Sequence, residues 1–149
     1  MKYFLFLLPL LLNASVIKVG DTLISKTLES QYERKHQLVE NGLWIISYNK
    51  DSSNTVNEYF TKHRFKKDIS FIVDAAQIPS ILFTLFAKPK MKKYKYPILL
   101  SFDENYNLTL PKKEGFITIL TIQNSMLKKI EYVKTLSILH TPKILKKAF

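Results

Sequence analysis

The strongest pattern in this chain is a series of short apolar runs that polar turns separate. Residues 43–48 are apolar except for Ser47, and polar residues flank the run on both sides. A continuous run of this length predicts a central strand that is buried on both faces. Residues 69–73, which Asp74 follows, and residues 97–102 have the same character. We therefore expect three buried strands in the middle of the chain, with turn residues at 103–107 after the third.

Two helices are expected between these strands. The first is predicted over residues 54–64 by apolar and aromatic residues at helical spacing, namely Val56, Tyr59, Phe60 and His63. We expect Ser52 or Ser53 to cap it, because a serine hydroxyl accepts a hydrogen bond from a free backbone N–H there.

The second helix is predicted after Pro79, because a first helical turn tolerates proline, and Pro89 is expected to end it. The apolar face predicted for it consists of Ile78, Ile81, Leu82, Leu85 and Phe86.

The two ends of the chain are expected to add hairpins and a last helix. Residues 27–28 and 36–38 flank the polar turn 31–35, which predicts a small N-terminal hairpin. Residues 116–122 and 129–133 flank the polar turn 123–125 and predict an antiparallel hairpin. Residues 135–149 are expected to form a helix that begins or is interrupted near Pro142.

This order of elements predicts the fold class. A strand–helix–strand unit followed by a hairpin and a terminal helix packs as a mixed sheet with helices on both faces. We therefore expect an α/β fold with a thioredoxin-like mixed sheet and an N-terminal hairpin. The chain has 149 residues, of which 46% are hydrophobic, which suits one domain. We place that domain at residues 16–149.

Residues 1–15 have the pattern of a secretory signal peptide. Lys2 gives a positive start, and residues 3–12 are an apolar run that ends at Asn13. A membrane-spanning helix needs roughly 20 apolar residues, so the run is too short for one. We expect cleavage after Ala14 or Ser15 and a location in the periplasm or outside the cell. Retention of the segment as an anchor is the alternative.

The chain is strongly basic, with a formal net charge of +11 that falls to +10 if Lys2 is removed with the signal. Positive charge on an exported protein favours anionic partners. We expect an acidic protein or an anionic envelope surface, and no nucleic acid. A composition rich in lysine, isoleucine and asparagine is also typical of an AT-rich genome, which would explain part of the charge without any partner. The oligomeric state is left open.

The absence of cysteine limits the chemistry of this chain. Thiol–disulfide exchange and thiol peroxidase activity both need a cysteine thiolate, so the chain performs neither. In an oxidising compartment the fold must also be stable without disulfides.

The order of elements resembles the thioredoxin-like superfamily. The opening Val19-Gly20-Asp21, followed by Thr27-Leu28 and the polar turn up to Leu38, is similar to the start of its peroxiredoxin and thiol-reductase branch. Residues 74–80, 86–91 and 96–100 resemble a group of small exported proteobacterial thioredoxin-fold proteins of unknown function that includes relatives of YtfJ. The resemblance implies this fold over nearly all of residues 16–149.

The resemblance also implies where a redox site would lie. Active members of the superfamily carry the nucleophilic cysteine where the helix after the central strand begins, because a helix N-terminus stabilises a thiolate. Here that place is occupied by Asp51, Ser52, Ser53 and Asn54. Those members also have a cis-proline before the hairpin strand, whereas residues 114–116 contain no proline. We expect a redox-inactive protein.

A lysine-rich loop is the main candidate for binding. Lysines are interleaved with aromatic residues between Pro89 and Pro97, and each lysine contributes about 1 kcal/mol near an anionic membrane. The loop could hold an anionic headgroup or an acidic protein, and a solvated connector is the simpler role. The candidate residues are Lys88, Lys90, Lys92, Lys93, Tyr94 and Lys95. A second basic segment near the C-terminus, with Lys143, Lys146 and Lys147, is expected to pack on the sheet, and binding to a membrane is the alternative.

Other chemistry has less support. Asp51 and Asp74 both follow parallel strands, so they could meet at one edge of the sheet. With Ser53 they could form the active site of a non-redox periplasmic enzyme, and helix capping is the simpler role for each aspartate. No metal site is expected, because no histidine has ligand spacing to other donors; the three are His36, His63 and His140. No cofactor is expected either, since the chain lacks a glycine-rich phosphate loop.

Three functions therefore remain open. The first is a redox-inactive binding or interaction module. The second is the non-redox enzyme, and the third is a peripheral envelope protein that binds anionic surfaces through the lysine-rich loop. No catalytic residue is assigned.

Overall fold

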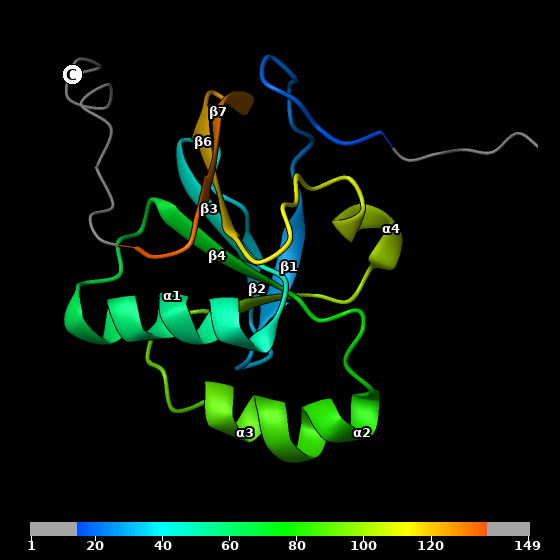
Figure 1. Cartoon of the computed structure of the whole chain (residues 1–149), viewed down its shortest axis with the longest axis vertical. Coiled ribbons are helices and arrows are strands. Elements are labelled where there is room, and N and C mark those ends of the chain that lie inside the picture. The colour runs from blue at the N-terminus through cyan, green and yellow to red at the C-terminus, as the bar shows by residue number, and fades with distance from the viewer. Residues whose placement is uncertain (1–14, 137–149) are drawn as a thin grey trace, which may run out of the picture.

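The structure is a computed structural model that describes residues 15–136 (Figure 1). Its centre is a seven-stranded sheet with the strand order β2-β1-β5-β4-β3-β6-β7. The strands are β1 (Thr27–Ser30), β2 (Lys35–Gln37), β3 (Gly42–Ser47), β4 (Ile69–Asp74), β5 (Leu99–Ser101), β6 (Ile117–Gln123) and β7 (Met126–Val133). β3, β4 and β5 are parallel to one another, and the other pairs are antiparallel. The predicted mixed α/β fold with an N-terminal hairpin is therefore confirmed.

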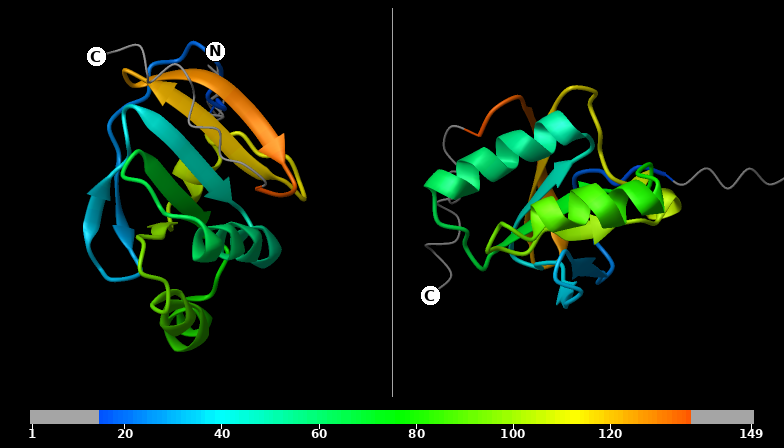
Figure 2. Two further views of the ribbon diagram at one scale, coloured as in Figure 1. Left: turned by 90° about the vertical axis from the view of Figure 1, so that its left-hand side faces the viewer. Right: turned by 90° about the horizontal axis from the view of Figure 1, so that it is seen from below.

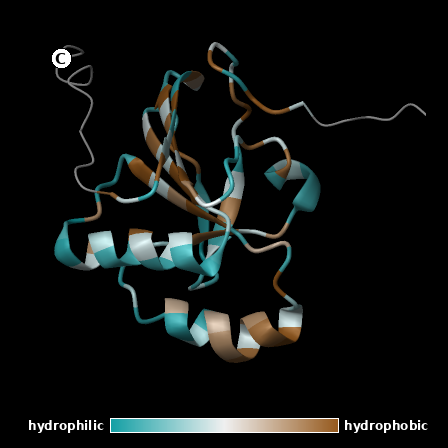
Figure 3. Cartoon of the chain, viewed as in Figure 1, coloured by the Kyte–Doolittle hydropathy of each residue, from teal (hydrophilic) through white to brown (hydrophobic). Residues whose placement is uncertain are grey.

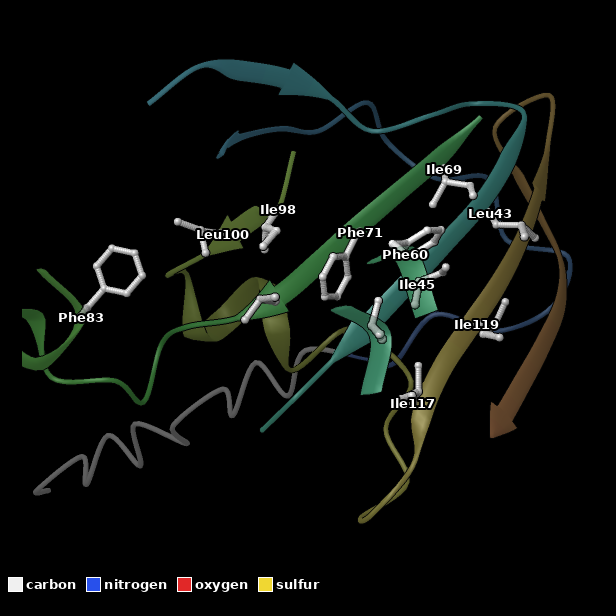
Figure 4. Packing of buried hydrophobic residues seen from close by; sticks show 12 residues of the cluster. Leu43, Ile45, Phe60, Ile69, Phe71, Phe83, Ile98, Leu100, Ile117 and Ile119 are labelled. Carbon is white, nitrogen blue, oxygen red and sulfur yellow. The ribbon is translucent and has the colours of Figure 1, made fainter. Parts of the chain in front are cut away.

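The parallel strands are connected by helices that lie on one face of the sheet. Helix α1 (Lys50–Lys62) joins β3 to β4, and a second helical segment joins β4 to β5. Both connections step in the same direction across the sheet, so right-handed crossovers place both helices on the same face. Accordingly, Phe60 of α1 and Phe83 of the second segment belong to one apolar cluster with Phe71 of β4 (Figure 4).

The opposite face has its own core and a lighter cover. Trp44, Ile46 and Leu120 are buried there, and the cover includes Tyr106 of the single-turn helix α4 (Glu104–Asn107) and Ile17 of the N-terminal segment. Helices therefore lie on both faces, as predicted, but the long ones share a face. Residues of β3 are buried along the whole strand, which confirms the predicted central strand.

The segment between β4 and β5 differs from its prediction. It comprises α2 (Ser80–Leu82), the π-helical turn η1 (Phe83–Ala87) and α3 (Lys88–Met91), so Pro89 does not end the helix. In the π turn, the N–H of Lys88 donates to the carbonyl of Phe83, five residues back. This wider turn directly before Pro89 relaxes the crowding that a proline ring causes inside an α-helix. The predicted end at Pro89 is wrong for that reason.

Smaller differences concern element ends. Residues 103–107 were predicted as a turn, but they form α4, in which the Asp103 side chain accepts a hydrogen bond from the N–H of Tyr106. β7 begins three residues before the predicted strand. It follows a tight turn in which Asn124 and Ser125 both have positive φ, as two-residue hairpins require. The predicted terminal helix falls almost entirely outside the described residues, as does most of the predicted signal peptide.

The described helices are short. Among residues 15–136, no helix has the length and apolar content that crossing a membrane requires.

Candidate functional site

The carboxyl ends of β3, β4 and β5 meet at one edge of the sheet. Ser47 ends β3, Asp74 ends β4 and Ser101 ends β5, and Asp74 pairs directly with Ser101 across the two strands. Open α/β sheets bind ligands at such an edge, so these side chains are candidates for a binding or catalytic site.

Asn107 of α4 closes this edge. Its amide donates to the Asp74 carboxylate at 2.7 Å and to the carbonyl of Ser101 at 3.1 Å, while its oxygen accepts from the Ser101 hydroxyl. The backbone N–H of Ala76 also donates to Asp74, at 3.1 Å. Ser101 and Asn107 are buried. All polar groups of the Asn107 side chain are bonded within this network. The network therefore explains the burial of Ser101 and Asn107 without a ligand.

Helix α1 begins at this same edge, earlier than predicted. Its N-cap is Asn49, whose side chain accepts from the N–H of Ser52 at 2.8 Å while the Ser52 hydroxyl faces the N–H of Asn49, which forms a capping box. The prediction that Ser52 or Ser53 is the cap is therefore wrong. Because Asn49 is the cap, the run from Asp51 to Asn54 lies inside α1 and not before it.

The three residues of the alternative enzyme hypothesis have different surroundings. The Ser53 hydroxyl lies 2.7 Å from the hydroxyl of Ser47, and Asp51 is exposed. Asp74 is bonded to Asn107. A serine nucleophile needs an adjacent base, and the partner of Ser53 here is another hydroxyl.

The loop before β6 packs against this edge through Tyr48. The Tyr48 hydroxyl donates to the carbonyl of Pro111 at 2.6 Å, and Thr118 donates to the same oxygen at 2.8 Å. Burial, with a smaller effect from the Asp74 carboxylate, raises the pKa of Tyr48 well above its usual value. Tyr48 therefore stays protonated and serves as a hydrogen-bond donor. Phe116 directly precedes β6, so residues 114–116, which contain no proline, lie immediately before this strand.

The described histidines lie away from this edge. His36 is in β2, and His63 is the C-cap of α1, where its Nδ1 lies 3.0 Å from the carbonyl of Tyr59 and its ring stacks on Tyr59. His140 falls outside the described residues. Within residues 15–136 no group of three or more His, Asp or Glu side chains is placed to hold a metal ion.

The lysine-rich loop is held in place by the N-terminal hairpin. Gln31 lies in the turn between β1 and β2, and its amide donates to the carbonyl of Tyr96 at 2.8 Å while its oxygen accepts from the N–H of Ile98 at 2.7 Å. The hydroxyl of Tyr32 donates to the carbonyl of Lys92 at 2.7 Å and also contacts that of Tyr94. The prediction of a polar turn at residues 31–35 did not reveal that Gln31 is fully buried.

The lysines of this loop point outwards, whereas its aromatic side chains point inwards. Lys90, Lys92, Lys93 and Lys95 are exposed. Lys88 forms an ion pair with Glu33, and hydrogen bonding to Lys88 together with the charges of Lys88 and Lys92 lowers the pKa of Glu33.

The aromatic members of the loop take part in the core. Tyr94 and Tyr96 pack against the apolar cluster, and the Tyr96 hydroxyl donates to Asn57 of α1 at 2.6 Å. Its ring stacks on Phe65, with centroids 5.1 Å apart. The loop therefore exposes several lysine ammonium groups, and its backbone is anchored to the core by its aromatic side chains.

A separate pocket of about 260 Å³ opens at the opposite edge of the sheet. It lies where β4 begins and is lined by residues that include His36, Lys67, Ser70 and Pro97. None of the candidate residues from the sequence lines it, so it is a feature that sequence patterns did not indicate.

Comparison with known proteins supports the fold alone. No protein-family model matches this chain, and no curated protein matches it. A proposed electron transfer protein from Aquifex aeolicus VF5 superposes with a TM-score of 0.55 at 12% identity, covering 80% of this chain and 91% of that one. A proposed electron transport protein from the same organism gives 0.53 at 14% identity with the same coverage. A peroxiredoxin-like protein from Aquifex aeolicus gives 0.49 at 8% identity, covering 83% of this chain and 80% of that one.

At these identities the likeness concerns architecture, not activity. The seven-stranded mixed sheet and the placement of α1 after the central strand give this cysteine-free chain a thioredoxin-like fold.

Proposed function

We propose that this chain is an exported, redox-inactive binding module on a thioredoxin-like scaffold, and that its lysine-rich loop binds an anionic partner in the cell envelope. The observation that carries the proposal is the way the loop is built. Gln31 and Tyr32 hold its backbone, and exposed lysines stand on its outer side. A solvated connector would not need a fully buried glutamine to hold it.

The sheet edge supports a non-catalytic role. Asp74, Ser101 and Asn107 satisfy one another, and the first turn of α1 is capped by Asn49. In our proposal, residues 51–54 stand where relatives with redox activity carry a cysteine. The export assignment rests on the signal-like pattern of residues 1–15, and the likeness to the YtfJ-like group stays a prediction from sequence.

The test compares two charge-reversal variants with equal net charge. Lys90→Glu/Lys92→Glu/Lys93→Glu removes the loop charge, and Lys18→Glu/Lys50→Glu/Lys128→Glu makes the same change at scattered exposed lysines. We expect wild type and the scattered variant to sediment with isolated envelopes at low salt, and the loop variant to stay in the supernatant. Raising salt should release the wild type, because surface charges are screened beyond a Debye length of about 10 Å at 0.1 M. Equal loss in both variants would show that net charge alone is responsible and would contradict the proposal.

A further inference from the structure

The helical segment from α2 to α3 is apolar on two sides but is covered on only one. Its inner side packs on the core through Phe83, Ala87 and Met91, which lie at four-residue intervals. Figure 1 shows this segment below α1, and in the view from below in Figure 2 it lies in front, nearest the viewer. The prediction of an apolar face was correct in its residue types, but four of its five members face solvent.

The uncovered side forms a continuous row, which we call the apolar ridge. Ile81, Leu82, Leu85 and Phe86 are 70%, 49%, 62% and 68% exposed. Figure 3 shows the hydrophobic colouring concentrated in this part of the helix. Single exposed apolar residues are ordinary, but four neighbours on two helical turns mark an interaction surface. A helix that is apolar all round is normally buried on every side.

The charge beside the apolar ridge indicates that its binding partner is anionic. The 28 residues between Asp74 and Asp103 contain five lysines and no acidic residue. The lysines begin directly after Ala87: Lys90 lies in α3, and Lys92 and Lys93 lie in the exposed turn that follows it. Exposed apolar side chains with lysines beside them are typical of elements that lie in a membrane interface.

We infer that the apolar ridge inserts into the interface of an anionic lipid bilayer while the adjacent lysines bind its headgroups. This inference rests on the proposed function and names the partner of the lysine-rich loop. A second copy of the chain fits less well, because pairing two ridges would bring two rows of lysines together. The chain's own residues 137–149 fit less well for the same reason, since they contain three lysines and no acidic residue.

The two parts of the surface act together on affinity. Each lysine near an anionic surface strengthens binding roughly fivefold, and each fully buried apolar side chain roughly tenfold or more. Binding is therefore expected to need anionic lipid and the ridge at the same time. Neutral phosphatidylcholine vesicles would engage only the ridge.

A tryptophan placed on the ridge tests insertion directly. Phe86→Trp, with Leu85→Trp as a second reporter, is mixed with vesicles that contain phosphatidylglycerol and brominated phosphatidylcholine. The native Trp44 is buried and gives a constant background. Ile24→Trp is the matched control, because Ile24 is 90% exposed but lies before β1, away from the ridge. The full chain is used, and local quenching separates insertion of the ridge from tethering by residues 1–15.

We expect strong quenching of Phe86→Trp and Leu85→Trp, little quenching of Ile24→Trp, and loss of quenching when phosphatidylglycerol is omitted. Reporters that stay in water on anionic vesicles would overturn the inference. Reporters that are shielded from water before lipid is added would also overturn it. Shielding in a self-associated chain would identify a second copy as the partner, and shielding in a monomer that is lost when residues 137–149 are deleted would identify that segment. If the ridge reporters are unquenched while the loop variant still loses envelope binding, the bilayer is the wrong partner and the proposed function stands.

Discussion

The side chain of Gln31 donates a hydrogen bond of 2.8 Å to the carbonyl oxygen of Tyr96 and thereby joins the N-terminal hairpin to the lysine-rich loop. These residues are 65 positions apart in the chain. The contact fixes the backbone on which the exposed lysines stand.

Replacing Gln31 is expected to loosen that loop. Gln31→Leu leaves the carbonyl of Tyr96 and the N–H of Ile98 without their side-chain partner, and each unsatisfied buried group costs about 1–3 kcal/mol. We expect a loss of about 3 kcal/mol in the free energy of unfolding, measured in urea, and faster amide exchange at residues 92–98. Gln37→Leu, at an exposed strand position, is the control. An equal loss in both variants would mean that Gln31 has no special role in the loop.

Asn107→Asp is expected to create a pH-dependent fold. The new carboxylate would face Asp74, and repulsion would raise the folded-state pKa of one of them above its unfolded value. The variant should therefore be more stable at acidic pH and lose stability as pH rises from about 4 through the raised folded pKa. Urea unfolding at several pH values measures this. Asp74→Asn/Asn107→Asp exchanges the two groups and should remove most of the dependence; a dependence that persists in it would place the cause elsewhere.

Tyr106 is expected to make the fold sensitive to alkali. Burial raises its pKa from 10.0 to about 12, so the folded state holds the proton more tightly than the unfolded state. Stability is then complete below about pH 10 and is lost as pH rises towards 12. Burial also raises the pKa of Tyr48 and Tyr96, which act in the same direction. Tyr106→Phe should reduce the loss in this window without abolishing it, as measured by unfolding and by phenolate absorbance. An unchanged pH profile would contradict the prediction.

Gly42 is expected to tolerate no side chain. A Cβ there would lie 1.9 Å from the carbonyl oxygen of Asp68, on rigid backbone where β3 meets the start of β4. Gly115 also has positive φ, but a Cβ there would meet nothing within 4 Å. Both Gly→Ala changes cost backbone strain of about 1–2 kcal/mol, and only Gly42→Ala adds the clash. The thermal midpoint of Gly42→Ala should therefore fall well below that of Gly115→Ala. Similar midpoints would show that the strands can separate without cost.

A cysteine introduced at the start of α1 tests the assignment of the lost redox position. The N-terminus of α1 and the hydroxyl of Ser47 should stabilise a thiolate in Ser53→Cys, so its pKa should lie below the usual value of about 8.5. Glu58→Cys, exposed in the middle of the same helix, should titrate near that value. The pH dependence of alkylation measures both. Equal pKa values would mean that residues 51–54 do not retain the environment of a redox helix start.

The elements whose signals are local could be predicted from the sequence alone. The apolar run at residues 43–48 predicted the central strand, and the absence of cysteine excluded thiol chemistry. The sequence could not predict that the helix between β4 and β5 continues through Pro89. It continues because a π turn before the proline relieves the crowding by its ring, and no local sequence pattern indicates a π turn. The first turn of α1 was misplaced since Asn49 and two serines compete for one cap, and the outcome depends on where β3 ends.

Which side chains meet and which face solvent depends on how segments that are distant in the chain pack together. Gln31 and Asn107 are ordinary polar residues in the sequence, and they acquire their roles because distant strands bring Tyr96 and Asp74 to them. The apolar residues of the segment from α2 to α3 were recognised from the sequence. Periodicity cannot tell which side of an apolar helix the sheet covers. The ridge is exposed because Phe83, on the other side of the helix, is the residue buried in the core.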